Sequence, residues 1–472
     1  MRPEGRVTND STGPVPGSPK GKSRRSEVSH PIASPEQWPF RWIAISSISW
    51  LLSQSMLVSN SVETFWKRQR KSRGVALAVS VIFVLAIALV ARRSRIVSWL
   101  PVPTGSSRVG TAIVTLPTKS SDADATPLAV QMWFPTLDFG EKHAPYAYGL
   151  PLTLRDRIVA SLVRTNAFAN ATIRAGRFPV VLYLPGAGGS RSANTALSEE
   201  LASVGYIVVA LNDTRLLSGG TNFSSAEKIM GTYAWGARRV RSETTDISRA
   251  IDALGRINRD PRSSFAGRLD LTRIGMLGYS FGGAVAAETA DREPRLRAAV
   301  DLDGALFGEA LTRGVVLPFM IVSSEPLVDQ PLKAGPVVDI DGYTRKSTSL
   351  KLSGLRRHGG YALTLADAGH YSLTDAALTP SFRHKGQGTV DPVRAFRLLS
   401  KFVVAFFDRH LKGIPRPLLL RSETNKDVIF RRFPGTANAK RVARIRRSNH
   451  KRSCYGVEAF EDVNVSAAPF MQ

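Results

Sequence analysis

The sequence predicts an α/β fold in which helices cover both faces of a mostly parallel sheet. From about residue 108 onward, segments with a strand pattern alternate with segments of helical spacing. Residues 178–184 and 206–211 are continuous apolar runs, which are typical of strands buried on both faces. A G-x-S-x-G sequence at 278–282 lies between an apolar strand pattern and a helix pattern of small residues.

The other elements follow from periodicity and turn residues, and together they predict a catalytic domain at residues 108–415. Further strands are predicted at 111–116, 128–134, 273–277, 296–302, 315–322 and 361–365. The first two of these are expected to form a hairpin at the sheet edge. Helices are predicted at 152–163, 196–204, 244–257 and 284–290. A last helix begins at Asp391-Pro392 and ends at Gly413.

Most of the positive charge lies outside this domain. The chain has a net charge of +26; residues 1–95 carry 15 Lys/Arg against 5 Asp/Glu, and residues 412–472 carry 13 against 5. Basic ends without a nucleic-acid-binding motif predict no nucleic-acid partner. Residues 1–74 are predicted to be a basic, disordered segment with a candidate interfacial helix at 40–58, and residues 416–472 a basic, disordered tail.

One apolar segment has the character of a membrane span. Residues 75–91 are 17 uncharged residues, at the lower limit for a helix that crosses a bilayer. More basic residues precede the segment than follow it, which places the amino end in the cytoplasm. This predicts a single-pass membrane protein with its catalytic domain outside the cytoplasm. One alternative is a cleaved signal peptide, favoured if translation starts at Met56, which gives a secreted protein. A buried core helix is the other alternative.

Ser280 is the predicted nucleophile. The serine of such a strand-turn-helix motif is exposed on a sharp turn, where Gly278 and Gly282 avoid collisions between side chains. A serine hydroxyl needs a base to become nucleophilic. His370 follows the strand 361–365 through a short turn, so it reaches the same edge of the sheet and is the predicted base.

Asp303 is the predicted acid, which orients the base and stabilises its charged form. It ends the strand that follows the helix after Ser280, and the next residue is a glycine that permits an immediate turn. Asp301 lies deeper in the same strand. Glu325 and Asp329 follow the next strand and are the competing acids.

Two backbone N–H groups are predicted to bind the oxyanion. One belongs to Phe281, directly after the nucleophile, and the other to Ala187 in the glycine-rich loop after residues 178–184. No cofactor and no metal are predicted. The single Cys454 excludes an internal disulfide and a thiolate metal cluster.

Several sequence blocks occur in a recognisable order: 127–135 (PLAVQMWFP), 178–188, 278–283 (GYSFGG), 302–303 and 369–372 (GHYS) with Asp375. They resemble the platelet-activating-factor acetylhydrolase family, including its bacterial dienelactone-hydrolase-like relatives, over about residues 109–415. The resemblance implies an α/β-hydrolase fold, with Ser280, Asp303 and His370 as the catalytic triad. Pro185 and Tyr279 depart from the family, because each stands where the family has a histidine.

The predicted function is that of a serine hydrolase that cleaves carboxylic esters of short-acyl lipids or small molecules through an acyl-enzyme intermediate. The resemblance implies an activity like that of a 1-alkyl-2-acetylglycerophosphocholine esterase. A catalytically silent, membrane-tethered binding protein with the same fold is one alternative, and a hydrolase of peptide or carbon-carbon bonds is another. The predicted partners are an ester substrate and, through residues 75–91, the membrane.

Overall fold

The computed structural model describes most of the chain after residue 97. The described residues are 83–84, 98–117, 128–138, 142–147, 150, 153–212, 226–328, 340–379 and 386–436. The chain divides into a unit of residues 1–87 and a compact unit of residues 88–472, and the strands discussed below all belong to the second unit.

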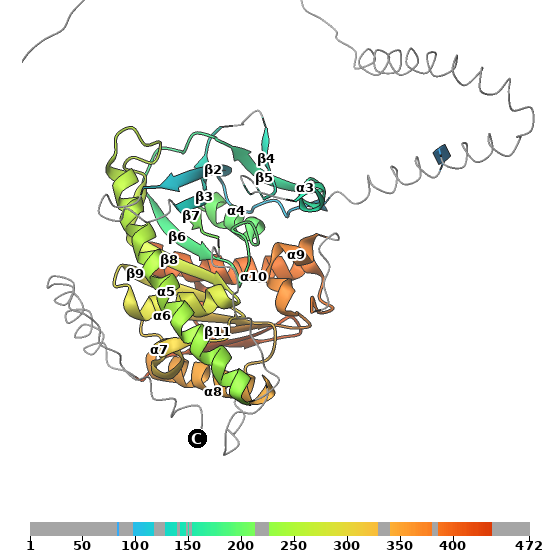
Figure 1. Ribbon diagram of the computed structural model, residues 1–472, viewed down its shortest axis with the longest axis vertical. Helices are drawn as coiled ribbons and strands as arrows, with labels where there is room; N and C mark the ends of the chain where they lie inside the picture. The colour runs from blue at the N-terminus through green and yellow to red at the C-terminus, as the bar shows by residue number, and fades with distance from the viewer. Residues whose placement is uncertain are drawn as a thin grey trace, which may run out of the picture. The chain divides into compact units, whose positions relative to one another are not determined.

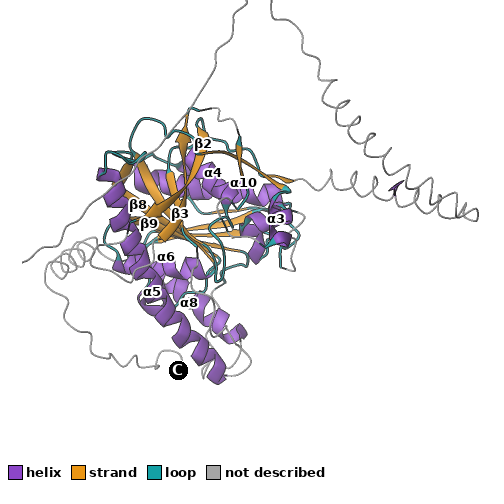
Figure 2. Ribbon diagram, turned by 45° about the horizontal axis from the view of Figure 1, so that its top comes forward, coloured by secondary structure: helices purple, strands orange, loops and turns teal. Residues whose placement is uncertain are grey.

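A mixed sheet forms the centre of the compact unit (Figures 1 and 2). In spatial order its strands are β1 (Ser98–Trp99), β5 (Val163–Ala169), β2 (Arg108–Leu116), β3 (Leu128–Thr136), β7 (Ile207–Ala210), β6 (Phe178–Leu184), β8 (Leu269–Tyr279), β9 (Leu296–Leu302), β10 (Phe319–Ser323), β11 (Gly360–Leu365), β13 (Val428–Phe433) and β12 (Glu423–Thr424). β4 (His143–Pro145) pairs with β5. Every neighbouring pair from β7 to β11 is parallel, which confirms the predicted, mostly parallel sheet.

The chain changes direction across the sheet at β6. After β6 it forms β7 on one side, and it then crosses to the other side of β6 to form β8. The loops that follow β6 and β8 therefore leave adjacent strand ends in opposite directions. Ligand sites of α/β sheets lie in the crevice that opens at such a point.

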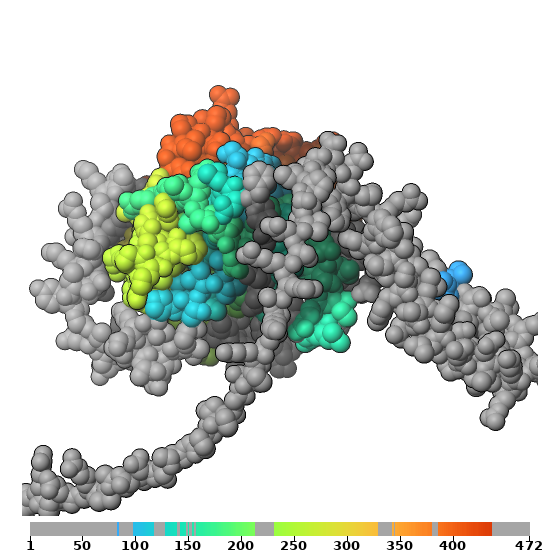
Figure 3. Space-filling model, turned by 90° about the horizontal axis from the view of Figure 1, so that it is seen from above, coloured from blue at the N-terminus to red at the C-terminus, as the bar shows by residue number. Residues whose placement is uncertain are grey.

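Helices cover both faces of the sheet, as predicted (Figure 2). α5 (Ala226–Arg259) and α6 (Phe281–Arg292) pack on one face with α7 (Gly308–Arg313) and α8 (Ile340–His358). α4 (Thr195–Ser203) and α10 (Pro392–Phe407) pack on the other. In Figure 3 the residues near 400, in orange, accordingly lie against residues coloured blue to green. α10 begins as predicted, since the Asp391 side chain accepts a hydrogen bond from Arg394 N at 2.8 Å.

The predicted hairpin is present but does not lie at the sheet edge. β2 and β3 pair antiparallel from Arg108 opposite Thr136 to Leu116 opposite Leu128. β5 pairs with the outer side of β2, and β1 lies beyond it. The helix predicted at 152–163 is also shorter, α3 (Leu154–Ala160), and it leads directly into β5. β5 was not predicted because polar residues interrupt its apolar pattern, although every second residue in its first part is buried.

The C-terminal boundary at residue 415 was placed too early. Residues beyond it form a short helical turn (Pro417–Leu419), β12 and β13, and β13 pairs antiparallel with β11. The Phe430 ring stacks on Tyr361 with centroids 5.9 Å apart and contacts Phe402 at 4.9 Å. These apolar contacts order the segment, whereas its neighbouring arginines suggested a solvated tail. Residues 437–472 lie outside the described residues.

The predicted membrane segment falls almost entirely outside the described residues. Of residues 75–91 only Phe83 and Val84 are described, and residues 1–74, with the candidate interfacial helix at 40–58, are not. Among the described residues, no helix combines the length and the apolar character needed to cross a bilayer.

Candidate active site

Ser280 occupies a strained turn between β8 and α6. Its backbone has φ 54° and ψ −120°, a conformation that costs a side-chain-bearing residue about 1–3 kcal/mol. Two hydrogen bonds fix it: Ser280 N donates to Leu302 O at 2.8 Å, and Gly283 N donates to Ser280 O at 2.9 Å. The turn therefore holds the serine at the carboxyl end of the parallel strands, and it leaves the side chain half-buried.

The glycines around Ser280 are required by close backbone packing. A Cβ on Gly278 would overlap the carbonyl of Gly282, and a Cβ on Gly282 would overlap the carbonyl of Leu184. A Cβ on Gly283 would collide with the Asp301 carboxylate. The glycines thus permit α6 to start directly against the ends of β6 and β9.

The structure brings the three predicted catalytic residues together. His370 Nε2 lies 3.1 Å from Ser280 Oγ, and His370 Nδ1 lies 2.8 Å from Asp303 Oδ2. His370 begins the 3-10 turn His370–Leu373 after β11, and Asp303 directly follows β9 with φ 57°. All three follow parallel strands, so they meet at the carboxyl ends of those strands, although 90 positions separate the serine from the histidine.

Asp303, among the predicted acids, is the one that contacts His370. It also accepts hydrogen bonds from Ser324 N at 3.0 Å and Ser324 Oγ at 2.6 Å. Burial would raise the pKa of Asp303, but the hydrogen bonds from His370 and Ser324 outweigh it and lower the pKa to about 2. The carboxylate is therefore ionised at neutral pH, and the stability it contributes is lost only as the pH falls from about 4 towards 2.

The other acids occupy different positions. Asp301 is fully buried, and its side chain accepts a hydrogen bond from Gly304 N at 2.7 Å. Glu325 is exposed, and Asp329 lies outside the described residues.

The two predicted oxyanion donors lie on the loops that border Ser280. Residues 186–189 form a tight turn, with Gly189 N donating to Gly186 O at 2.8 Å and Gly188 at φ 70°. A Cβ on Gly186 would be only 3.1 Å from Ser280 Cβ, so this loop lies against Ser280. Ala187 is exposed in that turn. Phe281 is the first residue of α6, where the helix ladder leaves backbone N–H groups unused.

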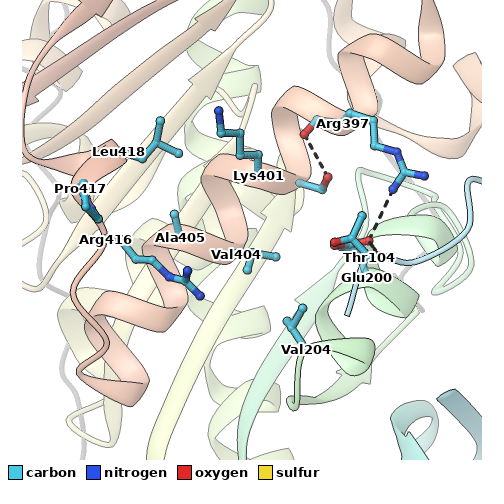
Figure 4. A pocket seen from close by; sticks show the side chains of 11 residues that line it. Thr104, Glu200, Val204, Arg397, Lys401, Val404, Ala405, Arg416, Pro417 and Leu418 are labelled. Atoms are coloured by element: carbon cyan, nitrogen blue, oxygen red, sulfur yellow. Dashed lines mark hydrogen bonds and ion pairs between the residues drawn. The ribbon is translucent and has the colours of Figure 1, made fainter. Parts of the chain in front are cut away.

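A cavity of about 460 Å³ adjoins the Asp303–His370 pair. Its wall is rich in polar side chains: Ser323, Ser324, Glu325, Ser347, Thr348 and Lys351. A second cavity of about 480 Å³ lies between α4 and α10, and Figure 4 shows it with Arg397 directed towards Glu200. None of the three predicted catalytic residues lines the second cavity, whereas Asp303 and His370 line the first, so we locate the candidate site beside the first. The described residues hold no cluster of His, Cys, Asp and Glu side chains suited to a metal ion.

Some contacts of the histidine segment were not expected from the sequence. Tyr279 packs its ring on His370, with centroids 4.9 Å apart, and its hydroxyl donates to His370 O at 3.3 Å. Asp375 accepts hydrogen bonds from Thr195 N at 2.7 Å and Ala196 N at 3.2 Å, the first residues of α4. Burial raises the pKa of the Asp375 carboxyl. No local pattern indicates such contacts, because the partners are about 180 positions apart.

Comparison with known proteins gives a consistent set of similarities. A family model described as PET hydrolase-like matches residues 166–334. The platelet-activating factor acetylhydrolase of Cavia porcellus is 25% identical over 199 residues, which cover 36% of this chain and 45% of that protein. The bis(hydroxyethyl) terephthalate hydrolase of Streptomyces coelicolor is 28% identical over 158 residues, which cover 32% of this chain and 43% of that protein.

A solved structure, a ferulic acid esterase from Streptomyces cinnamoneus, matches with a TM-score of 0.54 and 26% identity. The match covers 71% of this chain and 99% of that one. The chain spans about half the length of the curated relatives it matches. These findings confirm the resemblance to the platelet-activating-factor acetylhydrolase family, and the solved structure supports an α/β-hydrolase fold for this chain.

Proposed function

We propose that this α/β-hydrolase-fold protein is a serine esterase that cleaves carboxylic esters through a covalent acyl-enzyme. The observation that carries the proposal is the continuous contact from Ser280 Oγ through the His370 ring to Asp303. Several relatives are ester hydrolases by name, including a cutinase of Thermobifida alba, which supports this bond type over a peptide or carbon-carbon bond.

The contacts of Ser280, His370 and Asp303 support the following sequence of steps. His370 Nε2 takes the proton of Ser280 as the serine oxygen attacks the ester carbonyl carbon. Asp303, ionised and hydrogen-bonded to Nδ1, holds the ring in position and stabilises the imidazolium that forms. The N–H groups of Ala187 and Phe281 bind the oxyanion. His370 then protonates the departing alcohol, and a water molecule activated by the same nitrogen hydrolyses the acyl-enzyme.

The proposed substrates are esters of short-acyl lipids or small molecules. One relative is named a probable 1-alkyl-2-acetylglycerophosphocholine esterase, and the polar side chains in the wall of the adjoining cavity suit a polar group on the ester. Pro185 and Tyr279 both lie at the loops that border Ser280, and each replaces a family histidine. We therefore expect the ester preference to differ from that of the animal enzymes.

The nucleophile is tested with Ser280→Ala. We expect hydrolysis of short-chain nitrophenyl esters to fall at least about 10³-fold, because the three residues act as a unit, while the thermal unfolding temperature changes little. Ser161→Ala, an exposed serine on the loop before β5, is the matched control and should retain full activity. Wild-type activity that persists in Ser280→Ala would refute the assignment. Absence of labelling of wild-type Ser280 by a fluorophosphonate probe would instead favour a silent binding protein.

We further propose that residues 75–91 anchor the protein in a membrane, with the catalytic domain outside the cytoplasm. The support is the uncharged 17-residue run with basic residues on both sides. The full chain should sediment with membranes and resist carbonate extraction, and Phe83→Arg should release it because an arginine at the centre of a span costs about 3 kcal/mol. Soluble full-length wild type contradicts the anchor, and a mature chain that starts after residue 91 identifies a cleaved signal peptide.

A further inference from the structure

A buried ion pair lies directly behind the acid of the triad. Asp301 on β9 is fully buried, and its Oδ2 lies 3.4 Å from Nζ of Lys351, which comes from α8 and is itself buried. No step of the ester hydrolysis described above uses either side chain. Burying two charges is unfavourable unless their geometry and additional hydrogen bonds compensate for lost hydration, so the surroundings of this pair require an explanation.

Both members of the pair form hydrogen bonds with the turn that follows Asp303. Asp301 Oδ1 accepts the hydrogen bond of Gly304 N at 2.7 Å, and Lys351 Nζ donates to Gly304 O. The N–H that Asp301 binds belongs to the peptide leaving Asp303, a residue with φ 57° that needs external support. One charge therefore fixes each side of Gly304.

The same carboxylate also contacts the turn that carries the nucleophile. Gly283 approaches Asp301 Oδ1 so closely that a Cβ there would overlap it, and Gly304 likewise approaches Ser280 O. Asp301 is thus packed between the helix start after Ser280 and the turn after Asp303. A displacement of its carboxylate would shift both members of the site.

We propose that Lys351 and Asp301 are positioning residues of the triad, which hold Asp303 in the orientation that hydrogen-bonds His370 Nδ1. This inference rests on the proposed esterase function. Neither residue contacts the reacting atoms, so their effect is exerted through the Asp303–Gly304 backbone. Burial raises the pKa of the Asp301 carboxyl to about 6, although the Lys351 cation opposes that rise. The lysine therefore helps to keep the carboxylate ionised at neutral pH. The charged groups that act on Asp301 are Lys351 and Asp303.

A second buried pair elsewhere provides the matched control. Lys412 Nζ lies 3.1 Å from Asp408 Oδ1 and donates to Val204 O at 2.7 Å, so it too joins a carboxylate to a backbone carbonyl. This pair lies at the carboxyl end of α4, which is the end away from the triad. Both lysines are at most 16% exposed, so both substitutions place a methionine at a buried site. The two sites differ in that Asp408 also pairs with Arg416, which remains in Lys412→Met.

The experiment compares Lys351→Met with Lys412→Met in the full chain, by nitrophenyl acetate kinetics over pH 5–9 and by thermal unfolding. We expect Lys351→Met to lower kcat about tenfold with little change in KM, and to move the acid limb of kcat to higher pH because Asp301 loses its cation. Lys412→Met should lose thermal stability while it keeps the wild-type kcat and pH profile. Because Lys351 also lines the adjoining cavity, a raised KM with unchanged kcat would assign it to substrate binding and overturn the proposal.

A double variant, Asp301→Asn/Lys351→Met, has no uncompensated buried charge and keeps the inference testable if the single variant does not fold. The asparagine oxygen can still accept from Gly304 N, so the acid limb should return to the wild-type position and kcat should recover part of its loss. Equal kcat in the double variant and wild type would overturn the role of Lys351. Labelling of wild type by a fluorophosphonate probe separates the two proposals, since an unlabelled wild type refutes the esterase and not the positioning pair.

Discussion

Ser280 and His370, the proposed nucleophile and base, reach the same point through different contacts. Ser280 is held by backbone packing, in which glycines bring α6 against the ends of β6 and β9. His370 lies on a segment held by polar contacts: Ser372 Oγ accepts from Gly369 N at 3.0 Å, and Asp375 binds the first N–H groups of α4. The serine turn therefore tolerates no added atom. The histidine segment is equally tight at Gly369, where a Cβ would overlap the carbonyl of Gly386, but it depends on side-chain hydrogen bonds as well.

The largest effect is expected in the serine turn. Gly282→Ala places a methyl group against the carbonyls of Leu184 and Pro185, which are backbone atoms and cannot move aside cheaply. We expect a loss of about 3 kcal/mol or more in the free energy of unfolding, together with loss of esterase activity. Chemical denaturation and nitrophenyl ester hydrolysis measure the two.

Gly231→Ala is the matched control for that substitution. Gly231 is exposed in α5, and nothing lies within 4 Å of a Cβ placed there. Because alanine favours the helix, a gain of about 0.5–1 kcal/mol and unchanged activity are expected. A Gly282→Ala protein as stable as Gly231→Ala would break the contrast between the two regions.

A smaller effect is expected in the histidine segment. Asp375→Ala leaves the buried N–H groups of Thr195 and Ala196 without their acceptor, which costs about 1–3 kcal/mol. The segment that carries His370 should loosen, so kcat should fall about tenfold. Asp391→Ala removes a comparable but exposed acceptor at the start of α10; it should cost about 1 kcal/mol and leave kcat unchanged. Equal kcat in the two variants would show that Asp375 does not support the base.

The smallest effect is expected at Tyr279, where the serine turn contacts the histidine segment. Tyr279→Phe removes one hydrogen bond of 3.3 Å to His370 O and keeps the ring against the imidazole, so kcat/KM should stay within about threefold. Tyr361→Phe removes a bond of the same length to His410 and serves as the remote control. A change of ester preference confined to Tyr279→Phe would assign its hydroxyl to substrate recognition.

The three residues of the proposed triad could be selected from the sequence because each lies where a local pattern ends. Ser280 has a motif with a strand before it and a helix after it, while Asp303 and His370 each follow an apolar strand. The supports of these residues carry no such signal. Lys351 reads as one more basic residue of a polar helix, and its contact with Gly304 depends on how α8 packs. Asp375 belongs to the sequence block that resembles the family, but its hydrogen bonds to Thr195 and Ala196 depend on α4 beginning beside it.

The strands likewise fall into those that the sequence predicted and those that it did not. Strands buried on both faces, such as β6, were predicted from their apolar runs, and the change of direction at β6 fits the loops chosen for the site. β5 and β13 were missed, because their outward residues are polar or charged and only alternate positions are buried. An alternating pattern over so few residues is a weak signal for a strand, and neighbouring arginines favour a solvated loop instead.

The pairing of β13 with β11 affects the order in which the molecule can be completed. β11 leads directly to His370, but its outer hydrogen-bonding edge is covered by residues 428–433, which are synthesised more than sixty residues later. During synthesis β11 is therefore an open edge, to which other chains can add. A protein shortened to residue 415 would keep the whole triad and leave that edge bare, so for laboratory expression the chain should extend at least to residue 436.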